Sequence, residues 1–324
     1  MAEEYRGIMA YSEDKDTLFE LLSKGRELAD QLQTEVSAVL LGEKVEAEAG
    51  ELASYGADKV YVVESPQLKG LLAEACAEAL QAVISQAKPE VLLVGATKRG
   101  KELAPRVAEK LGTGCVAECV ALEVDAGSRE FKMKRVVFGG KVSSTHTIAG
   151  KPAIATIPPR IFEKKKADGR TAETVKVEAE ISPPKAEVVE VKPKETAGIR
   201  IEEAPIVICG GRGLKQQEDF KMLQELAEVL GGQVGCTRPI AADRGWFPEW
   251  VGLSGKKIQP SLYIAVGVSG AIQHVAGIRS SKIVVSVNKD ADAPIFADSD
   301  YGIVEDLYKV VPALTEALRK ILKK

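Results

Sequence analysis

The sequence is poor in the residues that metal and thiol chemistry require. It has only two histidines, His146 and His274, and five cysteines that form no CxxC pair. Cys115 and Cys119 stand four positions apart, but no histidine lies near them in the sequence to complete a zinc site. We therefore expect no metal site, and we expect buried, reduced thiols of the kind found in cytoplasmic proteins.

Long apolar runs and an excess of positive charge are also absent. Runs such as Ile206 to Cys209 stop far short of the ~20 apolar residues that a membrane-spanning helix needs. The formal net charge of −3 provides no broad basic field, so nucleic acid is not an expected partner. The amino terminus, "MAEEYRG", is acidic and shows neither an Arg-rich leader nor a signal-peptide core, which again predicts a cytoplasmic protein.

Apolar strands and helices alternate over residues 1–162, which we expect to form the first of two domains. The strands are "RGIMAYS", "EVSAVLLG", "DKVYVVES" and "PEVLLVGATKRG", and the helices are Lys15–Leu32, Leu68–Ala87 and Lys101–Leu111. Continuous apolar strands separated by helices predict a parallel sheet that is covered on both faces. The later stretch "EFKMKRVVFGGKVSSTHTI" predicts a hairpin around Gly139-Gly140.

Residues 163–204 differ in composition and predict a linker with edge strands. Lys, Glu, Val, Pro and Thr dominate, and Pro183-Pro184 and Pro193 exclude a regular helix. Within this segment "TVKVEAEI" and "AEVVEVK" alternate well enough to be strands. A second α/β domain is expected over residues 205–324, with helices at Gln216–Leu230 and Val311–Leu322.

Polar residues follow successive strands of this second domain. Arg212, Arg238, Ser269 and Asn288 fall at or just beyond the carboxyl ends of the predicted strands. In an open α/β sheet this edge is where ligands bind. The pattern therefore predicts a site there, with donors for phosphate and cations for an electron-rich ring.

The individual turns allow more than one interpretation. Arg212 in "GGRGLK" can lie over a planar ring or form a fork to phosphate, although the turn is not GxGxxG. Ser269 in "GVSGAIQ" suits a phosphate at a helix start, or is a plain N-cap. His274 is either a core histidine bonded to a carbonyl or part of the site. Trp246 and Trp250 are interpreted as core, and "VGATKRG" is either a phosphate turn or an exposed basic loop.

Several separated motifs together resemble the alpha subunit of electron-transfer flavoproteins. They are "CGGRGLK", "GCTR", "VGLSGKK", "LYIAVGVSGAIQHVAG", "VNKDADAPIF" and "DYGIVEDLYKVVP", in family order and spacing over about residues 205 to 316. The resemblance implies a Rossmann-like FAD-binding domain with a parallel sheet at residues 205–324. It also implies a heterodimer with a beta subunit, and FAD as the cofactor.

The resemblance also implies which residues contact FAD. They are Arg212, Thr237, Arg238, Val251, Gly252, Leu253, Ser254, Ser269, Gly270, Ala271, Ile272, Gln273, His274, Asn288, Asp306 and Leu307. Arg212, Thr237 and Arg238 would approach the isoalloxazine ring, with Arg238 stabilising the reduced, anionic flavin. The stretch 251–254 would border the ring, and the Ser254 hydroxyl would point towards flavin N5.

The remaining implied contacts lie along the rest of the cofactor. Residues 269–274 would wrap the ribityl–phosphate region, with His274 directed at the pyrimidine side of the ring. Asn288, Asp306 and Leu307 would meet the adenosine half. Leu253 is a departure, because many members of the family carry Gln there.

The expected function is therefore electron transfer without a substrate-transforming site of its own. The donors implied are acyl-CoA dehydrogenases, as in fatty acid oxidation, or an NADH-linked partner. The acceptor implied is a quinone oxidoreductase or ferredoxin, and the latter would fit flavin-based electron bifurcation. Two alternatives remain: an NAD-dependent enzyme, against which stands the missing GxGxxG with its acidic partner, and an adenine-nucleotide-binding module built on "VGATKRG".

Overall fold

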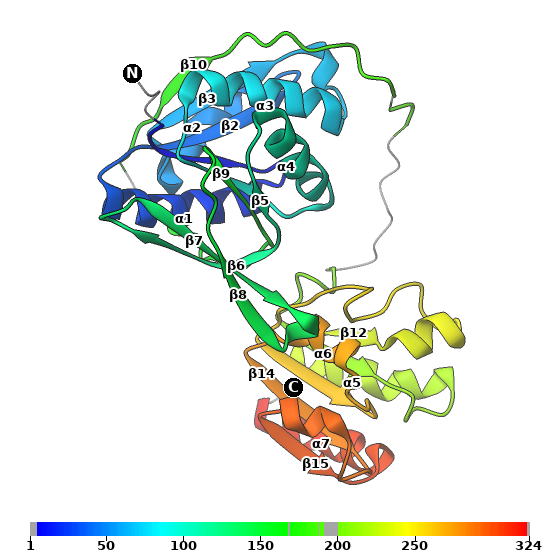
Figure 1. Cartoon of the computed structure of the whole chain (residues 1–324). Coiled ribbons are helices and arrows are strands. Elements are labelled where there is room, and N and C mark those ends of the chain that lie inside the picture. The colour runs from blue at the N-terminus through cyan, green and yellow to red at the C-terminus, as the bar shows by residue number, and fades with distance from the viewer. Residues whose placement is uncertain (1–4, 168, 187, 191–199, 323–324) are drawn as a thin grey trace. The chain divides into compact units, whose positions relative to one another are not determined.

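The computed structural model describes residues 5–322 apart from residues 168, 187 and 191–199 (Figure 1). The chain divides into two compact units, Met1–Lys192 and Pro193–Lys324, each with its own sheet and core. The strands of the first unit are β1 (Ile8–Tyr11), β2 (Val36–Gly42), β3 (Lys59–Glu64), β4 (Val91–Gly95), β5 (Cys115–Val116), β6 (Cys119–Asp125), β7 (Glu130–Val137), β8 (Val142–His146), β9 (Ala153–Ile157) and β10 (Glu173–Lys176). Its helices are α1 (Lys15–Leu32), α2 (Ala49–Leu52), α3 (Ala73–Ala87) and α4 (Lys98–Leu111).

The first unit is built on a 7-stranded parallel sheet in the order β10-β3-β2-β1-β4-β9-β5. The apolar side of α1 packs on one face of this sheet, and α3 and α4 cover the other face. Strands β6, β7 and β8 form a separate antiparallel sheet that packs on the α1 side. The predicted parallel sheet, covered on both faces, and the hairpin around Gly139-Gly140 are both confirmed.

Some predicted helix boundaries are wrong for local reasons. The helix expected from Leu68 begins only at Ala73, because Gly70 and Leu71 adopt left-handed φ angles of 75° and 51° that no α-helix contains. In contrast, α4 begins three residues before the predicted Lys101. The Thr97 hydroxyl accepts a hydrogen bond from the Gly100 N–H at 2.9 Å and caps the helix there.

One of the two predicted edge strands is present. Residues 173–176, which overlap the start of "TVKVEAEI", form β10, which adds to the edge of the sheet beside β3. The stretch "AEVVEVK" is not a strand at residues 186 and 188–190, and its other residues lie outside the described part of the chain.

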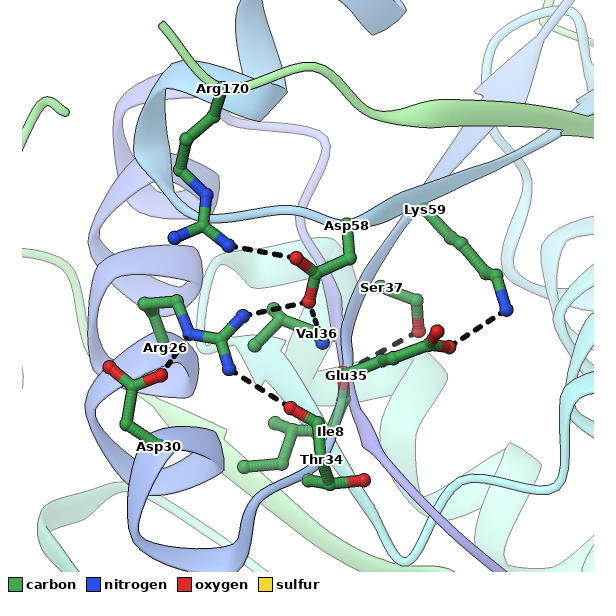
Figure 2. Close-up of polar contacts among 10 residues, drawn as sticks. All are labelled: Ile8, Arg26, Asp30, Thr34, Glu35, Val36, Ser37, Asp58, Lys59 and Arg170. Carbon is green, nitrogen blue, oxygen red and sulfur yellow. Dashed lines mark hydrogen bonds and ion pairs between the residues drawn. The ribbon is translucent and has the colours of Figure 1, made fainter. Parts of the chain in front are cut away.

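An ion-pair network holds the start of β2 and β3 to α1 and to the segment before β10 (Figure 2). The Asp58 carboxylate accepts hydrogen bonds from Arg26 at 2.7 Å, from Arg170 at 2.8 Å and from the Val36 N–H at 2.9 Å. Burial alone would raise the pKa of Asp58, but the Val36 N–H and the two guanidinium groups outweigh it and lower the pKa. Asp58 therefore connects three segments that lie far apart in the sequence.

Asp58→Ala should lower the free energy of unfolding by about 1–2 kcal/mol, because it removes charge-assisted hydrogen bonds from a half-buried position. Asp30→Ala is the matched control. Asp30 also pairs with Arg26, at 2.8 Å, but its side chain is 67% exposed, so it should cost at most about 0.5 kcal/mol. Urea denaturation of the two variants measures the difference, and equal losses would contradict this assignment.

The second unit has a 5-stranded parallel sheet and three α-helices in its described part. Its elements are β11 (Ile206–Gly210), α5 (Phe220–Leu230), β12 (Gln233–Cys236), β13 (Leu262–Val266), α6 (Ile272–Ile278), β14 (Ile283–Asn288), β15 (Tyr301–Val304) and α7 (Leu307–Leu322). The strand order is β12-β11-β13-β14-β15. Helices α5 and α7 pack on one face, and α6 packs on the other. The predicted α/β class with a parallel sheet in each domain is confirmed.

Two details of this unit differ from the prediction. Strand β15 was not predicted, because its four residues are all exposed at the sheet edge and show no buried alternation. Helix α7 begins at Leu307 rather than at Val311, because the Asp306 carboxylate accepts a hydrogen bond from the Tyr308 N–H at 2.9 Å and caps it.

The five cysteines are free, and four of them are buried, as expected. Burial raises the pKa of Cys119 and of Cys236 to about 12, so these thiols stay protonated at neutral pH. Within the described ranges, no helix combines the length and apolar character needed to cross a bilayer. The same residues bring together no group of three or more His, Cys, Asp or Glu side chains able to hold a metal.

Candidate functional site

A cavity of about 770 Å³ lies at the carboxyl ends of the strands of the second unit. It is formed by the loops after β11, β12, β13 and β14, by residues 250–254 and by the start of α7. The order of the strands reverses between β11 and β13, and ligands of doubly wound sheets bind at such a switch point. The volume is in the range of sites that hold a cofactor-sized ligand, about 300–1,000 Å³.

The cavity brings together all but one of the residues predicted for the site. The lining residues that were predicted are Arg212, Thr237, Arg238, Val251, Gly252, Leu253, Ser254, Ser269, Gly270, Ala271, Gln273, His274, Asn288, Asp306 and Leu307. The exception is Ile272, which is 51% exposed and lies outside the lining. As the first residue of α6 it follows the loop that lines the cavity.

Several other lining residues are not among the predicted FAD contacts. They are Gly213, Lys215, Pro239, Trp250, Gly267, Val268, Lys289, Asp290, Ala293, Pro294 and Tyr308. Trp250 was interpreted as core, whereas it packs against the α5 side of the sheet and also faces the cavity. Trp250 directly precedes the predicted contact Val251, and this neighbouring position could have identified it as a cavity-lining residue. Trp246 lies edge-on to Phe220, with ring centroids 6.2 Å apart.

Glycines allow the loops after β11 and β13 to meet at the switch point. A Cβ on Gly211 would lie 2.3 Å from the Gly267 carbonyl oxygen, and a Cβ on Gly213 would lie 2.8 Å from the Gly267 Cα. The Gly213 N–H donates to the Gly267 carbonyl at 3.0 Å. Only glycine fits this close approach, because a side chain at either position would push the two loops apart.

Positive charge is available at the rim of the cavity. Arg212 and Arg238 are exposed, and in the described part of the chain neither guanidinium pairs with a carboxylate. Lys289 is likewise exposed at the rim, and the Lys215 ammonium lies 5.2 Å from the centre of the Tyr308 ring. These cations suit a ligand that carries phosphates or gains negative charge.

Other predicted polar residues use their side chains to hold the loops in place. The Asn288 amide donates to the Val268 carbonyl at 2.9 Å and accepts from the Asp290 N–H at 3.0 Å. Asp306 caps α7. The Ser254 hydroxyl accepts from the Trp250 indole N–H at 3.3 Å. These bonds give each side chain a structural role whether or not it touches a ligand.

His274 is buried, with 7% of its surface exposed. Its Nδ1 lies 3.1 Å from the Val251 carbonyl oxygen, and its Nε2 lies 2.7 Å from the Tyr263 hydroxyl. Burial lowers the pKa of His274 to about 4, partly opposed by the bond to Val251. The carbonyl bond is the one expected of a core histidine, while the ring also lines the cavity.

Ser269 does not cap a helix. Helix α6 begins at Ile272, its N-cap is Ala271, and no side chain bonds to its first turn. The capping interpretation of Ser269 is therefore wrong, and its exposed hydroxyl stays available at the cavity.

The "VGATKRG" turn of the first unit has no comparable arrangement. Thr97 caps α4 and donates its hydroxyl hydrogen to the Glu13 carboxylate at 2.6 Å. A carboxylate therefore lies at the switch point between β1 and β4, where a nucleotide phosphate would have to bind. Lys98 and Arg99 are exposed. The geometry favours the exposed-loop interpretation over a phosphate site.

The fold and the cavity define a doubly wound α/β protein with a cofactor-sized, cation-rimmed cavity in its second unit. The family described as "Electron transfer flavoprotein domain" matches residues 12–182, and the "Electron transfer flavoprotein FAD-binding domain" matches residues 200–279. The chain belongs to the electron transfer flavoprotein alpha-subunit family.

Similar proteins extend over nearly the whole chain. The electron transfer flavoprotein subunit alpha of Megasphaera elsdenii is 41% identical, with 98% of this chain and 97% of the relative covered. The corresponding subunit of Thermoanaerobacterium thermosaccharolyticum is 39% identical over 98% of this chain and 99% of its own. The lactate dehydrogenase (NAD(+),ferredoxin) subunit LctC of Acetobacterium woodii is 38% identical over 96% of this chain and 76% of its own.

FAD is the cofactor of this family, and the cavity fits it. The volume of the cavity suits a cofactor-sized ligand, and the rim cations suit both the phosphates of FAD and a reduced ring. An electron-transfer role follows from family membership. The alternative of an NAD-dependent enzyme on a related fold is thereby superseded.

Proposed function

We propose that the chain forms a heterodimer with an electron transfer flavoprotein beta subunit and carries electrons between a dehydrogenase and a downstream acceptor. The observation that carries this proposal is the cavity itself, because it gathers the predicted contact residues at one switch point. FAD, when bound, supplies the redox chemistry. The chain's own residues bind it, orient it and set the charge around it.

The contacts divide between two kinds of residue. Arg212 and Arg238 are the groups free to face the ring, and a fixed guanidinium favours the form of the flavin that carries extra negative charge. Asn288, Asp306 and His274 hold the surrounding loops through their own hydrogen bonds. The proposed contacts of Ser254 with flavin N5 and of Asn288 and Asp306 with the adenosine half are additional to these bonds.

The proposal also includes the classes of electron donor and electron acceptor. The donor is an acyl-CoA dehydrogenase, as in fatty acid oxidation, or an NADH-linked partner. The acceptor is a quinone oxidoreductase or ferredoxin. The name of the Acetobacterium relative includes both NAD(+) and ferredoxin, which supports the pairing of NADH with ferredoxin and thus the bifurcating mode. The free thiols of the chain support a cytoplasmic location.

Counting the nucleotides bound to the purified heterodimer tests the proposed function, and it also distinguishes a simple electron shuttle from a bifurcating protein. The chain is produced together with its beta subunit, and the FAD and AMP released on denaturation are measured. One FAD with AMP would indicate a simple shuttle, and two FAD without AMP would indicate bifurcation. A preparation without FAD, also after incubation with added FAD, would contradict the proposed function.

Ser269→Ala should weaken FAD binding about 5- to 10-fold, because it removes one hydroxyl hydrogen bond worth ~1 kcal/mol. Its melting temperature without FAD should stay unchanged, since Ser269 caps no helix. FAD titration followed by flavin fluorescence, and thermal unfolding of the FAD-free protein, provide the two measurements. A lower melting temperature with unchanged FAD affinity would show that the hydroxyl acts on the fold.

A further inference from the structure

A buried chain of hydrogen bonds runs behind the cavity from β13 to the loop at residues 250–254. Tyr263 on β13 has no exposed surface, and its hydroxyl lies 2.7 Å from Nε2 of His274 on α6. The other ring nitrogen, Nδ1, lies 3.1 Å from the carbonyl oxygen of Val251. The chain therefore joins three elements through a single imidazole.

The chemistry of the two partners decides where the imidazole proton lies. A carbonyl oxygen can only accept, so Nδ1 must carry the hydrogen and donate it to Val251. A neutral ring with its hydrogen on Nδ1 has a lone pair on Nε2. Nε2 therefore accepts, and the Tyr263 hydroxyl donates to it. In this tautomer both ring nitrogens are satisfied within the protein.

Among the described residues, burial and the bond to Val251 are the two influences that shift the pKa of the His274 ring. The ionisable groups that act on Tyr263 are the thiols of Cys209 and Cys236, and burial raises the pKa of both. The same burial lowers the pKa of His274. The imidazole therefore stays uncharged around neutral pH.

The loop that His274 supports borders the cavity. The Val251 N–H donates to the Cys236 carbonyl at 2.9 Å, and the Leu253 N–H donates to the Gln273 carbonyl at 2.7 Å. A Cβ on Gly277 would lie 2.4 Å from the Gly252 Cα, so α6 and this loop are in direct contact. A change in the orientation of the His274 ring would therefore move the Val251 carbonyl and the loop with it.

We propose that Tyr263 is a positioning residue, whose hydroxyl holds His274 as the Nδ1-protonated neutral tautomer and thereby fixes the Val251–Ser254 edge of the cavity. The effect on the cofactor rests on the proposed function, because that edge matters only if the cavity holds flavin. The tautomer itself does not depend on it. The imidazole then directs no N–H at the flavin, and its influence on the ring passes through residues 251–254.

Nitrogen-15 NMR of histidine-labelled protein tests the proposal directly. The chain has only two histidines, so His146→Gln leaves His274 as the only labelled imidazole. We expect a protonated Nδ1 and a hydrogen-bonded, unprotonated Nε2 between about pH 6 and pH 8. A protonated Nε2, or a charged imidazolium in that range, would overturn the proposal, and this result needs no variant of Tyr263.

Tyr263→Phe then removes only the hydroxyl, and Tyr301→Phe, at a tyrosine that is 65% exposed in the same unit, is the control. In Tyr263→Phe we expect the Nε2 resonance to shift and FAD to bind about 3- to 10-fold more weakly, with neither change in Tyr301→Phe. An unchanged Nε2 resonance would refute the role of Tyr263. The flavin absorbance of the same samples reports separately whether FAD binds at all, so a failure of the proposed function is distinguished from a failure of this inference.

Discussion

Gly270→Ala is expected to abolish stable FAD binding and to destabilise the second unit. Gly270 has a φ angle of 87°, and a Cβ there would lie 2.2 Å from the Ile295 backbone nitrogen. The loop after β13 bonds to this segment through the Ile295 N–H and the Ser269 carbonyl, which are 3.1 Å apart. Because Ala293 and Pro294 also line the cavity, separating the two segments deforms two of its walls.

The expected cost combines backbone strain with a clash against a backbone atom, roughly 3–5 kcal/mol in the free energy of unfolding. FAD affinity should fall at least ~30-fold, equivalent to about 2 kcal/mol. Gly231→Ala is the matched control, since Gly231 has a φ angle of 71° but no atom within 4 Å of the added Cβ. It should cost only about 1–2 kcal/mol and leave FAD binding intact. Urea denaturation measures the loss of stability in each variant, and FAD titration measures the loss of affinity. Equal losses of stability and affinity in Gly270→Ala and Gly231→Ala would contradict the account.

Arg238→Ala should lower the midpoint potential of the bound flavin. The exposed Arg238 lines the cavity directly after the buried Thr237, and its guanidinium has no carboxylate partner among the described residues. The guanidinium is therefore available to the extra negative charge of the reduced ring. Losing a hydrogen bond to a charged group costs about 1.5–3 kcal/mol, which corresponds to roughly 60–130 mV in a one-electron step.

Spectroelectrochemical titration of the FAD-loaded heterodimer measures this shift. Arg319→Ala on α7 removes the same charge from an exposed position outside the cavity, so it controls for net charge and should leave the potential unchanged. Arg238→Lys should recover part of the shift, because an ammonium keeps the charge but not the planar fork. A potential that is the same in Arg238→Ala and in the unchanged protein would show that Arg238 does not face the ring.

The sequence predicts the architecture because its signals are local. Continuous apolar strands such as "LYIAV" and the glycine turns that follow them predict buried parallel strands and loops at one edge of a sheet. The helix boundaries are wrong for local reasons, in turns and caps, whereas the errors in strands arise where the deciding contact is distant. Whether a segment such as "AEVVEVK" becomes a strand depends on a ladder partner elsewhere in the chain. Strand β15 forms by pairing with β14, although its own residues show no alternation of buried and exposed positions.

The candidate site was also largely predictable, but the roles of its residues were less so. The motifs identify which loops meet, and the structure places nearly all the predicted residues around one cavity. They do not reveal that Tyr263 and Val251 satisfy both nitrogens of His274, or that Asp306 caps α7. The partners of His274 depend on packing between elements, which no sequence spacing encodes, whereas the Asp306 cap is a local contact that the N-cap preference for aspartate could have predicted. Trp250 was missed because a core residue can also line a cavity.

The central claim is that FAD binds at the switch point of the second unit, and the most direct test is the FAD content of variants of the chain purified with the beta subunit. We predict that Gly270→Ala removes one FAD per heterodimer, whereas Lys98→Ala and Arg99→Ala at the "VGATKRG" turn of the first unit leave the FAD content unchanged. Full FAD content in Gly270→Ala, or loss of FAD only in the first-unit variants, would contradict the account.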